Sequence, residues 1–189
     1  MVHQPIWIGK SFQGLASDRR NGSNFDDGDV DAPPHAPSLH GGSPLSLPRT
    51  PEPKTLSPYE EAHEYEAMDH AGVNRQFVDD LLAGGKPVGP QVIDLGCGPG
   101  AIPIELSQRL DSIQVLAIDS EVEMLEIAKR EIDIAGLLDQ ITLHHADVCN
   151  MPEYEDGMTD TVISNSMLHH LEQPELGLAT AVRLVREGG

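Results

Sequence analysis

Residues 92–100 of the chain read VIDLGCGPG, a short apolar run that ends in an acid and is followed by three glycines at alternate positions. The apolar run is typical of a buried strand in a parallel sheet, because such strands are covered on both faces and lose the alternation of apolar and polar residues. Glycines directly after a strand let the backbone turn tightly and approach a ligand that any Cβ atom would keep away.

A helix is predicted directly after this loop. The apolar residues Ile102, Leu106 and Leu110 recur at a spacing of four, which is close to the period of one helix face. Pro103 lies in the first turn of this helix, where its missing N–H costs little. The order of strand, glycine loop and helix predicts a nucleotide-binding cradle.

Two kinds of nucleotide fit the loop. Gly96, Gly98 and Ala101 satisfy the dinucleotide pattern G-x-G-x-x-G/A, and Asp119 lies near the position of the acid that accompanies that pattern. An NAD-binding protein is therefore one interpretation. The acid two residues before the first glycine, Asp94, suits a ligand that carries an ammonium group, whereas a pyrophosphate favours the bare N–H groups of a helix start.

The chain resembles the class I S-adenosylmethionine (SAM)-dependent methyltransferases, whose first motif is acid-x-G-x-G-x-G. Four residues match that motif without a gap, namely Asp94, Gly96, Gly98 and Gly100. The resemblance covers residues 58–189 and corresponds to the N-terminal, cofactor-binding half of the domain. It implies SAM as the cofactor and methyl transfer as the activity.

The rest of the chain alternates between predicted strands and helices. Further strands are expected at 113–118, 141–145 and 161–164, and further helices at 60–83, at 122–135 and from Pro174 onward. This alternation predicts an α/β fold, a doubly wound Rossmann-like parallel sheet with helices on both faces. In helix 60–83 we expect a bend at Gly72 and one apolar stripe, formed by Tyr65, Met68, Val73, Phe77 and Leu81. In the last helix we expect the apolar stripe to consist of Leu178, Val182 and Val185.

Composition divides the chain into two parts. Residues 1–55 are rich in Pro, Gly and Ser and are predicted to form a disordered tail, because such a segment buries too little apolar surface to offset its ordering entropy. Residues 56–189 form the predicted methyltransferase domain. Members of the resembled family have seven strands, so we expect this domain to be truncated after strand four. A SAM-binding but catalytically incomplete fragment, self-associating through an exposed strand four, is thus a second interpretation.

Acidic residues follow three predicted strands, at the edge where a doubly wound sheet binds its ligand. With SAM as the ligand, Asp94 would contact the methionine ammonium, and Asp119, with Ser120 beside it, would accept hydrogen bonds from the ribose hydroxyls. Asp147 would accept from the adenine amino group and the Val148 N–H would donate to the adenine ring. The loop residues expected around the methionine and ribose are Gly96, Cys97, Gly98 and Gly100. A helix cap or a turn is the simpler interpretation of any one of these acids.

Residues 164–170 follow the fourth strand and read SNSMLHH. Asn165 is a candidate to contact the cofactor or the substrate. His169 and His170 are candidate general bases, because the imidazole pKa suits proton transfer near neutral pH, although a surface position is the simpler interpretation of each. The segment resembles that of family members that act on small molecules. We expect no metal site at His144-His145, because adjacent strand residues point to opposite faces of the sheet.

Charge and cysteine content indicate the class of substrate and the cellular compartment. The net charge is −19, almost all of it after residue 55. Nucleic acid is therefore a disfavoured substrate, because its phosphates repel so acidic a domain, and a small-molecule methyl acceptor is expected. The two cysteines, Cys97 and Cys149, are too few for a disulfide framework and favour a cytoplasmic setting. Neither a signal peptide nor a membrane span is recognisable.

Overall fold

Four parallel strands form the sheet of the computed structural model, which describes residues 57, 59–60, 64, 68 and 70–188. The strands are β1 (Gln91–Leu95), β2 (Gln114–Asp119), β3 (Ile141–His145) and β4 (Thr161–Ile163), in the order β3-β2-β1-β4. The strand order reverses between β1 and β4, which is where doubly wound sheets bind ligands. The predicted parallel α/β fold is confirmed. The tail predicted for residues 1–55 lies outside the described residues.

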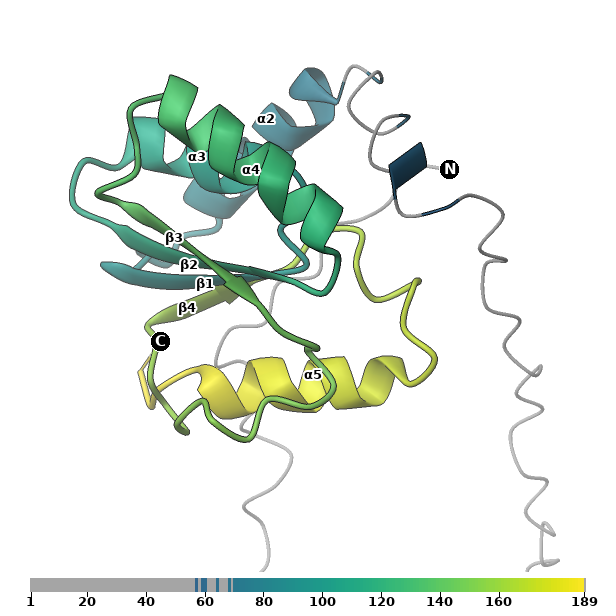
Figure 1. Ribbon diagram of the computed structural model, residues 1–189. Coiled ribbons are helices and arrows are strands. Elements are labelled where there is room, and N and C mark those ends of the chain that lie inside the picture. The colour runs from purple at the N-terminus through teal and green to yellow at the C-terminus, as the bar shows by residue number, and fades with distance from the viewer. Residues whose placement is uncertain (1–56, 58, 61–63, 65–67, 69, 189) are drawn as a thin grey trace, which may run out of the picture. The chain divides into compact units, whose positions relative to one another are not determined.

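Helices cover both faces of this sheet (Figure 1). One face carries α2 (Ala71–Ala83), α3 (Ala101–Arg109) and α4 (Val122–Ile134), and the other carries α5 (Pro174–Leu184). The prediction of helices on both faces is therefore also confirmed.

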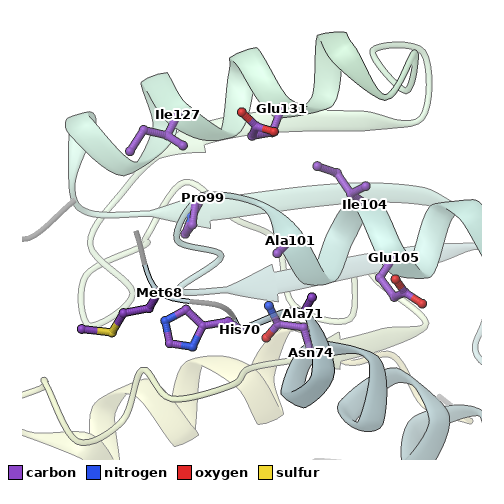
Figure 2. Close-up of a pocket in the computed structure, with 10 residues that line it drawn as sticks. All are labelled: Met68, His70, Ala71, Asn74, Pro99, Ala101, Ile104, Glu105, Ile127 and Glu131. Carbon is purple, nitrogen blue, oxygen red and sulfur yellow. The ribbon is translucent and has the colours of Figure 1, made fainter. Parts of the chain in front are cut away.

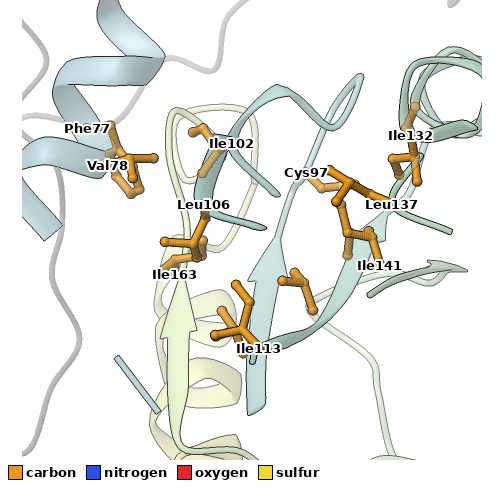
Figure 3. Close-up of a cluster of buried hydrophobic side chains, with 14 residues drawn as sticks. Phe77, Val78, Cys97, Ile102, Leu106, Ile113, Ile132, Leu137, Ile141 and Ile163 are labelled. Atoms are coloured by element: carbon orange, nitrogen blue, oxygen red, sulfur yellow. The ribbon is translucent and has the colours of Figure 1, made fainter. Parts of the chain in front are cut away.

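Each face of the sheet has its own hydrophobic cluster. In the larger cluster, Phe77, Leu106 and Ile132 pack α2, α3 and α4 onto the strands (Figure 3). The smaller cluster packs Leu184 of α5 against the opposite face, together with Met151 from the segment between β3 and β4. Adjacent strand residues point to opposite faces, so each strand contributes to both clusters and is buried on both sides.

The helix expected over 60–83 is interrupted before Gly72. Glu60 and Glu64 are helical, Met68 lies in a bend, and α2 begins at Ala71. Gly72 therefore lies inside the first turn of α2, and the predicted bend at this residue is wrong.

The buried face of α2 also differs in part from the predicted stripe. Phe77 is buried and Leu81 packs against the same cluster, as expected, but Val73 is exposed. Its neighbour Asn74 is buried in its place. Residues 74, 77, 78 and 81 follow the helical period more closely than the predicted set, so α2 places a polar residue on its inner face.

The predicted stripe of the last helix is wrong at two of its three residues, since only Val185 packs against the smaller cluster. Leu178 and Val182 are exposed, whereas Gly177 and Leu184 of α5 are buried. A Cβ atom at Gly177 would lie 2.7 Å from Cδ1 of Leu171. The missing side chain at Gly177 thus allows the segment after β4 to pack on this face of the helix, which the apolar period alone does not indicate.

Candidate functional site

Backbone hydrogen bonds tie the carboxyl ends of β1, β2 and β3 together. The N–H groups of Gly96 and Cys97 both donate to the Ile118 carbonyl, at 2.8 and 3.0 Å, and the Ala146 N–H donates to the Asp119 carbonyl at 3.0 Å. The glycine loop, residues 96–100, therefore lies at one edge of the sheet with the residues that follow β2 and β3. The site predicted from the sequence lies at this same edge.

Asp94 is a buried carboxyl group near the end of β1. Its side chain is 2% exposed, and its Oδ2 atom has no hydrogen-bond partner among the described residues. Burial, with a smaller contribution from the nearby Asp119 charge, raises the pKa of Asp94 to about 8. Both effects disfavour the ionised form. A cation beside Oδ2 would offset both, so this position is complementary to a positively charged ligand group.

Asp119 ends β2 and holds the glycine loop in place. Its Oδ2 accepts a hydrogen bond from the Gly98 N–H at 2.8 Å, and its Oδ1 accepts one from the Glu121 N–H at 2.9 Å. Burial raises the pKa of Asp119, while these two bonds oppose the shift. Each carboxylate oxygen has a further lone pair, so Asp119 retains the capacity to accept hydrogen bonds from ligand hydroxyls.

The three glycines of the loop have different surroundings. All three have positive φ angles, 74° at Gly96, 52° at Gly98 and 81° at Gly100. A Cβ atom at Gly96 would lie 2.5 Å from Cβ of Met167, whereas one at Gly98 would meet nothing within 4 Å among the described residues. Gly96 is thus required by packing as well as by conformation, and Gly98 leaves space at the site.

The residues predicted after β2 and β3 lie nearby. The Ser120 carbonyl is 3.0 Å from Nε2 of His145. Asp147 is exposed and accepts a hydrogen bond from the Cys149 N–H at 2.9 Å, which forms a turn, and Val148 is buried. Asp147 therefore has the turn-forming role that the simpler interpretation gives it, and its exposed carboxylate retains lone pairs for a ligand.

The segment after β4 is anchored to β1. The Ser164 hydroxyl donates to the Leu95 carbonyl at 2.8 Å, which places half-buried Asn165 beside the end of β1. His169 and His170 are exposed, with ring centroids 3.9 Å apart. Met167, which contacts the glycine loop at Gly96, was not among the residues predicted from the sequence.

Cys97 and the neighbouring residues His144 and His145 have separate surroundings. Cys97 is buried in the loop, and burial, with the Asp94 and Asp119 charges, raises the pKa of its thiol, which disfavours the reactive thiolate. His144 Nδ1 lies 2.8 Å from the Tyr154 hydroxyl, away from the Ser120 carbonyl that His145 contacts. No group of metal-binding side chains is found in the described part of the chain.

Comparison with known proteins identifies the family. Residues 92–189, more than half of the chain, match the family model described as a methyltransferase domain. The chain belongs to this family.

Three relatives illustrate its range. The 27-O-demethylrifamycin SV methyltransferase of Amycolatopsis mediterranei is 30% identical over 112 residues, 58% of this chain and 40% of that protein. The tRNA1(Val) (adenine(37)-N6)-methyltransferase of Vibrio campbellii is 29% identical over 126 residues, 52% of each chain. The crystal structure of a candidate S-adenosyl-L-methionine-dependent methyltransferase from Methanococcus maripaludis superposes with a TM-score of 0.66 at 25% identity, over 75% of this chain and 65% of that one.

The chain is shorter than many of its relatives. It spans 24% to 53% of the length of the first curated proteins that it matches. Within the portion that the structure describes, no helix combines the length and the apolar character needed to cross a membrane.

Proposed function

We propose that this chain binds SAM at the carboxyl ends of β1, β2 and β3 and transfers its methyl group to a small molecule. The observation that carries the proposal is the Asp94 carboxyl, which is fully buried and leaves Oδ2 without a partner among the described residues. An unpaired buried charge costs several kcal/mol or forces the group to take up a proton. The ammonium group of SAM would supply the missing partner, whereas a pyrophosphate would add a further negative charge.

The proposed roles of the other residues follow from their positions. Asp119 would bind the ribose hydroxyls while it holds the Gly98 N–H. Asp147 and the Val148 N–H would bind the adenine from the end of β3, with Ser120 beside Asp119. The loop residues Gly96, Cys97, Gly98 and Gly100 would surround the methionine and ribose. Binding of NAD in place of SAM would contradict these roles.

SAM supplies a methyl group on a positively charged sulfur, and the chain contributes mainly alignment and the exclusion of water, which are worth about 7–11 kcal/mol of barrier in well-oriented reactions. Asn165 would contact the cofactor or the acceptor beside the end of β1. His169 or His170 would accept a proton from the acceptor, because both side chains are exposed in the segment after β4 and imidazole is the commonest general base in enzymes.

The acceptor is proposed to be a small molecule. The net charge of −19 disfavours nucleic acid, and the rifamycin methyltransferase among the relatives is named for a small-molecule substrate. The tRNA methyltransferase among them shows that this family also includes proteins named for an RNA substrate. Methyl transfer from labelled SAM to total tRNA, compared with transfer to a small-molecule extract, distinguishes the two; label in tRNA would contradict the proposal.

Calorimetry on the full chain tests the cofactor. S-adenosylhomocysteine is expected to bind and NAD is not.

A pair of variants tests the glycine loop. Gly98→Ala and Gly136→Ala are matched, because both glycines have positive φ and neither Cβ would meet a described atom within 4 Å. Both variants should lose similar stability, but only Gly98→Ala should lose affinity, by at least tenfold. Tight binding of NAD, or equal affinity in the two variants, would contradict the assignment.

A further inference from the structure

A pocket of about 360 Å³ lies between the start of α2, the start of α3 and the side of α4 (Figure 2). This volume is within the range of small-molecule sites, about 300–1,000 Å³. Pro99 and Ala101, which flank the last glycine of the loop, contribute to its wall. None of the residues proposed above to bind SAM is among the described residues that line it, so the pocket is distinct from the proposed cofactor site although the two share the loop.

The pocket contains a buried amide. Asn74 is 7% exposed and lines the pocket from α2 (Figure 2). Its amide group has no hydrogen-bond partner among the residues that the structure describes. Because an amide both donates and accepts, a ligand group that also does both would be complementary to it.

The rest of the wall is mostly apolar or acidic, and it also includes His70. Its apolar part consists of Met68, Ala71, Pro99, Ala101, Ile104 and Ile127. Its charged part consists of Glu105 and Glu131, with no Lys or Arg among the described residues that line it. Arg109 pairs with Glu105, with Nη2 2.6 Å from Oε1, and Arg130 pairs with Glu131 at 3.1 Å. The Glu131 pair is largely exposed, so water weakens it.

From this wall we propose that the pocket is a second ligand site, which binds a small molecule with an apolar body and either a neutral carboxamide or a protonated amine. The apolar residues contact the body, and the Asn74 amide exchanges hydrogen bonds with the polar group. Glu131 favours a positive charge at that group. A carboxylate of the same shape is disfavoured, because Glu105 and Glu131 line the pocket and no Lys or Arg does so among the described residues. The proposal does not depend on methyl transfer.

Three molecules of one shape and different charge test the chemistry: benzamide, benzylamine and benzoate. Their binding to the full chain is measured by saturation-transfer NMR, and their location by the methyl resonances of Ile104 and Ile127. Benzamide and benzylamine are expected to bind and to shift these resonances, and benzoate to bind at least tenfold more weakly. Binding of benzoate as well as benzamide, binding of none of the three, or binding without these shifts overturns the proposal.

Two variants assign the contacts. Asn74→Leu, of similar volume, should weaken benzamide about tenfold, and unchanged benzamide binding would overturn the proposal. Glu131→Gln should weaken benzylamine several-fold and leave benzamide unchanged, with the exposed Asp133→Asn on the same helix as the control. Circular dichroism checks that Asn74→Leu folds. If it does not, the test rests on Glu131→Gln, and benzylamine binding that is equal in Glu131→Gln and Asp133→Asn overturns the proposal. Binding of S-adenosylhomocysteine, measured separately, reports on the cofactor site alone.

Discussion

At the scale of single residues, the Asp94 carboxyl is 2% exposed, and its pKa is raised to about 8 by burial and by Asp119. In the unfolded chain an aspartate carboxyl has a pKa of about 3.9 and is protonated only below about that pH. Between these two values the folded chain therefore holds more protons than the unfolded chain, and the free energy of unfolding falls as the pH rises. Above the folded pKa this loss is complete.

Asp94→Asn should therefore stabilise the chain at neutral and alkaline pH. Each unit of the raised pKa costs the wild type about 1.4 kcal/mol of unfolding free energy above pH 8, and an uncharged amide avoids the ionisation. Thermal melts from pH 4 to pH 9 check this. The difference between variant and wild type should grow with pH up to about 8 and then remain level, because only Asp94 differs between the two.

The same substitution should weaken binding of S-adenosylhomocysteine at least tenfold at pH 8, since the amide lacks the charge that pairs with the ammonium. In the wild type, affinity should rise from pH 6 to pH 8 as Asp94 ionises more readily. A variant that is less stable than wild type at pH 8, or that binds equally well, contradicts the proposed role.

Asp119→Ala should affect both the ligand and the loop. It removes the acceptors of the Gly98 and Glu121 N–H groups as well as the proposed ribose contacts, and hydrogen bonds to charged groups are worth about 1.5–3 kcal/mol each. Affinity for S-adenosylhomocysteine should fall at least tenfold and the melting temperature should fall too. Asp139→Ala, at an exposed position, is the control. Unchanged calorimetric affinity would remove Asp119 from the site.

At the scale of elements, the strands and the glycine loop could be predicted because their signals are local. The apolar run and the glycine spacing at 92–100 define a strand and a turn without reference to the rest of the chain. The inner face of α5 could not be predicted, since it depends on Leu171, a residue outside the helix that packs on Gly177. An apolar period identifies a helix, but it does not choose between two apolar faces.

The positions of the candidate site residues could likewise be predicted where the end of a strand determines them. Asp94 and Asp119 lie at strand ends as expected, but the bond between Asp119 and the Gly98 N–H depends on the loop conformation. Met167 was missed because its contact with Gly96 joins segments about seventy residues apart. A signal for Asn74 was available, because it lies three and four residues before the buried Phe77 and Val78.

Gly96→Ala should show how the loop depends on the segment after β4. The added methyl group would lie 2.5 Å from Cβ of Met167, whereas at Gly136, with a similar φ of 71°, it would meet nothing within 4 Å. Backbone strain alone costs about 1–2 kcal/mol, so Gly136→Ala should lose about that much. Gly96→Ala should lose clearly more in denaturant unfolding. Equal losses would mean that the contact with Met167 relaxes without cost.

At the scale of the whole molecule, β4 has no neighbouring strand on its outer side among the described residues. The Thr159 N–H and carbonyl bond to Leu184 and Arg186, while the Asp160 N–H bonds to Gln91 of β1. Because backbone groups alternate in direction along a strand, the Thr161 N–H points outward. An outward N–H on a short apolar strand is a site for pairing with another chain.

The 189-residue chain should therefore self-associate as its concentration rises, and Thr161→Pro should reduce this by removing the outward N–H at the first position of β4. Sedimentation velocity over a concentration series measures the effect. Thr161→Val is the matched control, because it also loses the hydroxyl that accepts from the Gly89 N–H but keeps its own N–H. A wild-type chain that remains monomeric throughout, or a proline variant that associates equally, contradicts this prediction.

The hydrogen bond from the Gly98 N–H to Asp119 also has a consequence for the rate of binding. With this bond and the two bonds to the Ile118 carbonyl in place, the loop has its binding conformation before a ligand arrives. Little backbone entropy is then left to lose on association, and the loop backbone should move little between the free and bound forms. Association should be a single step whose observed rate rises in proportion to ligand concentration without reaching a plateau.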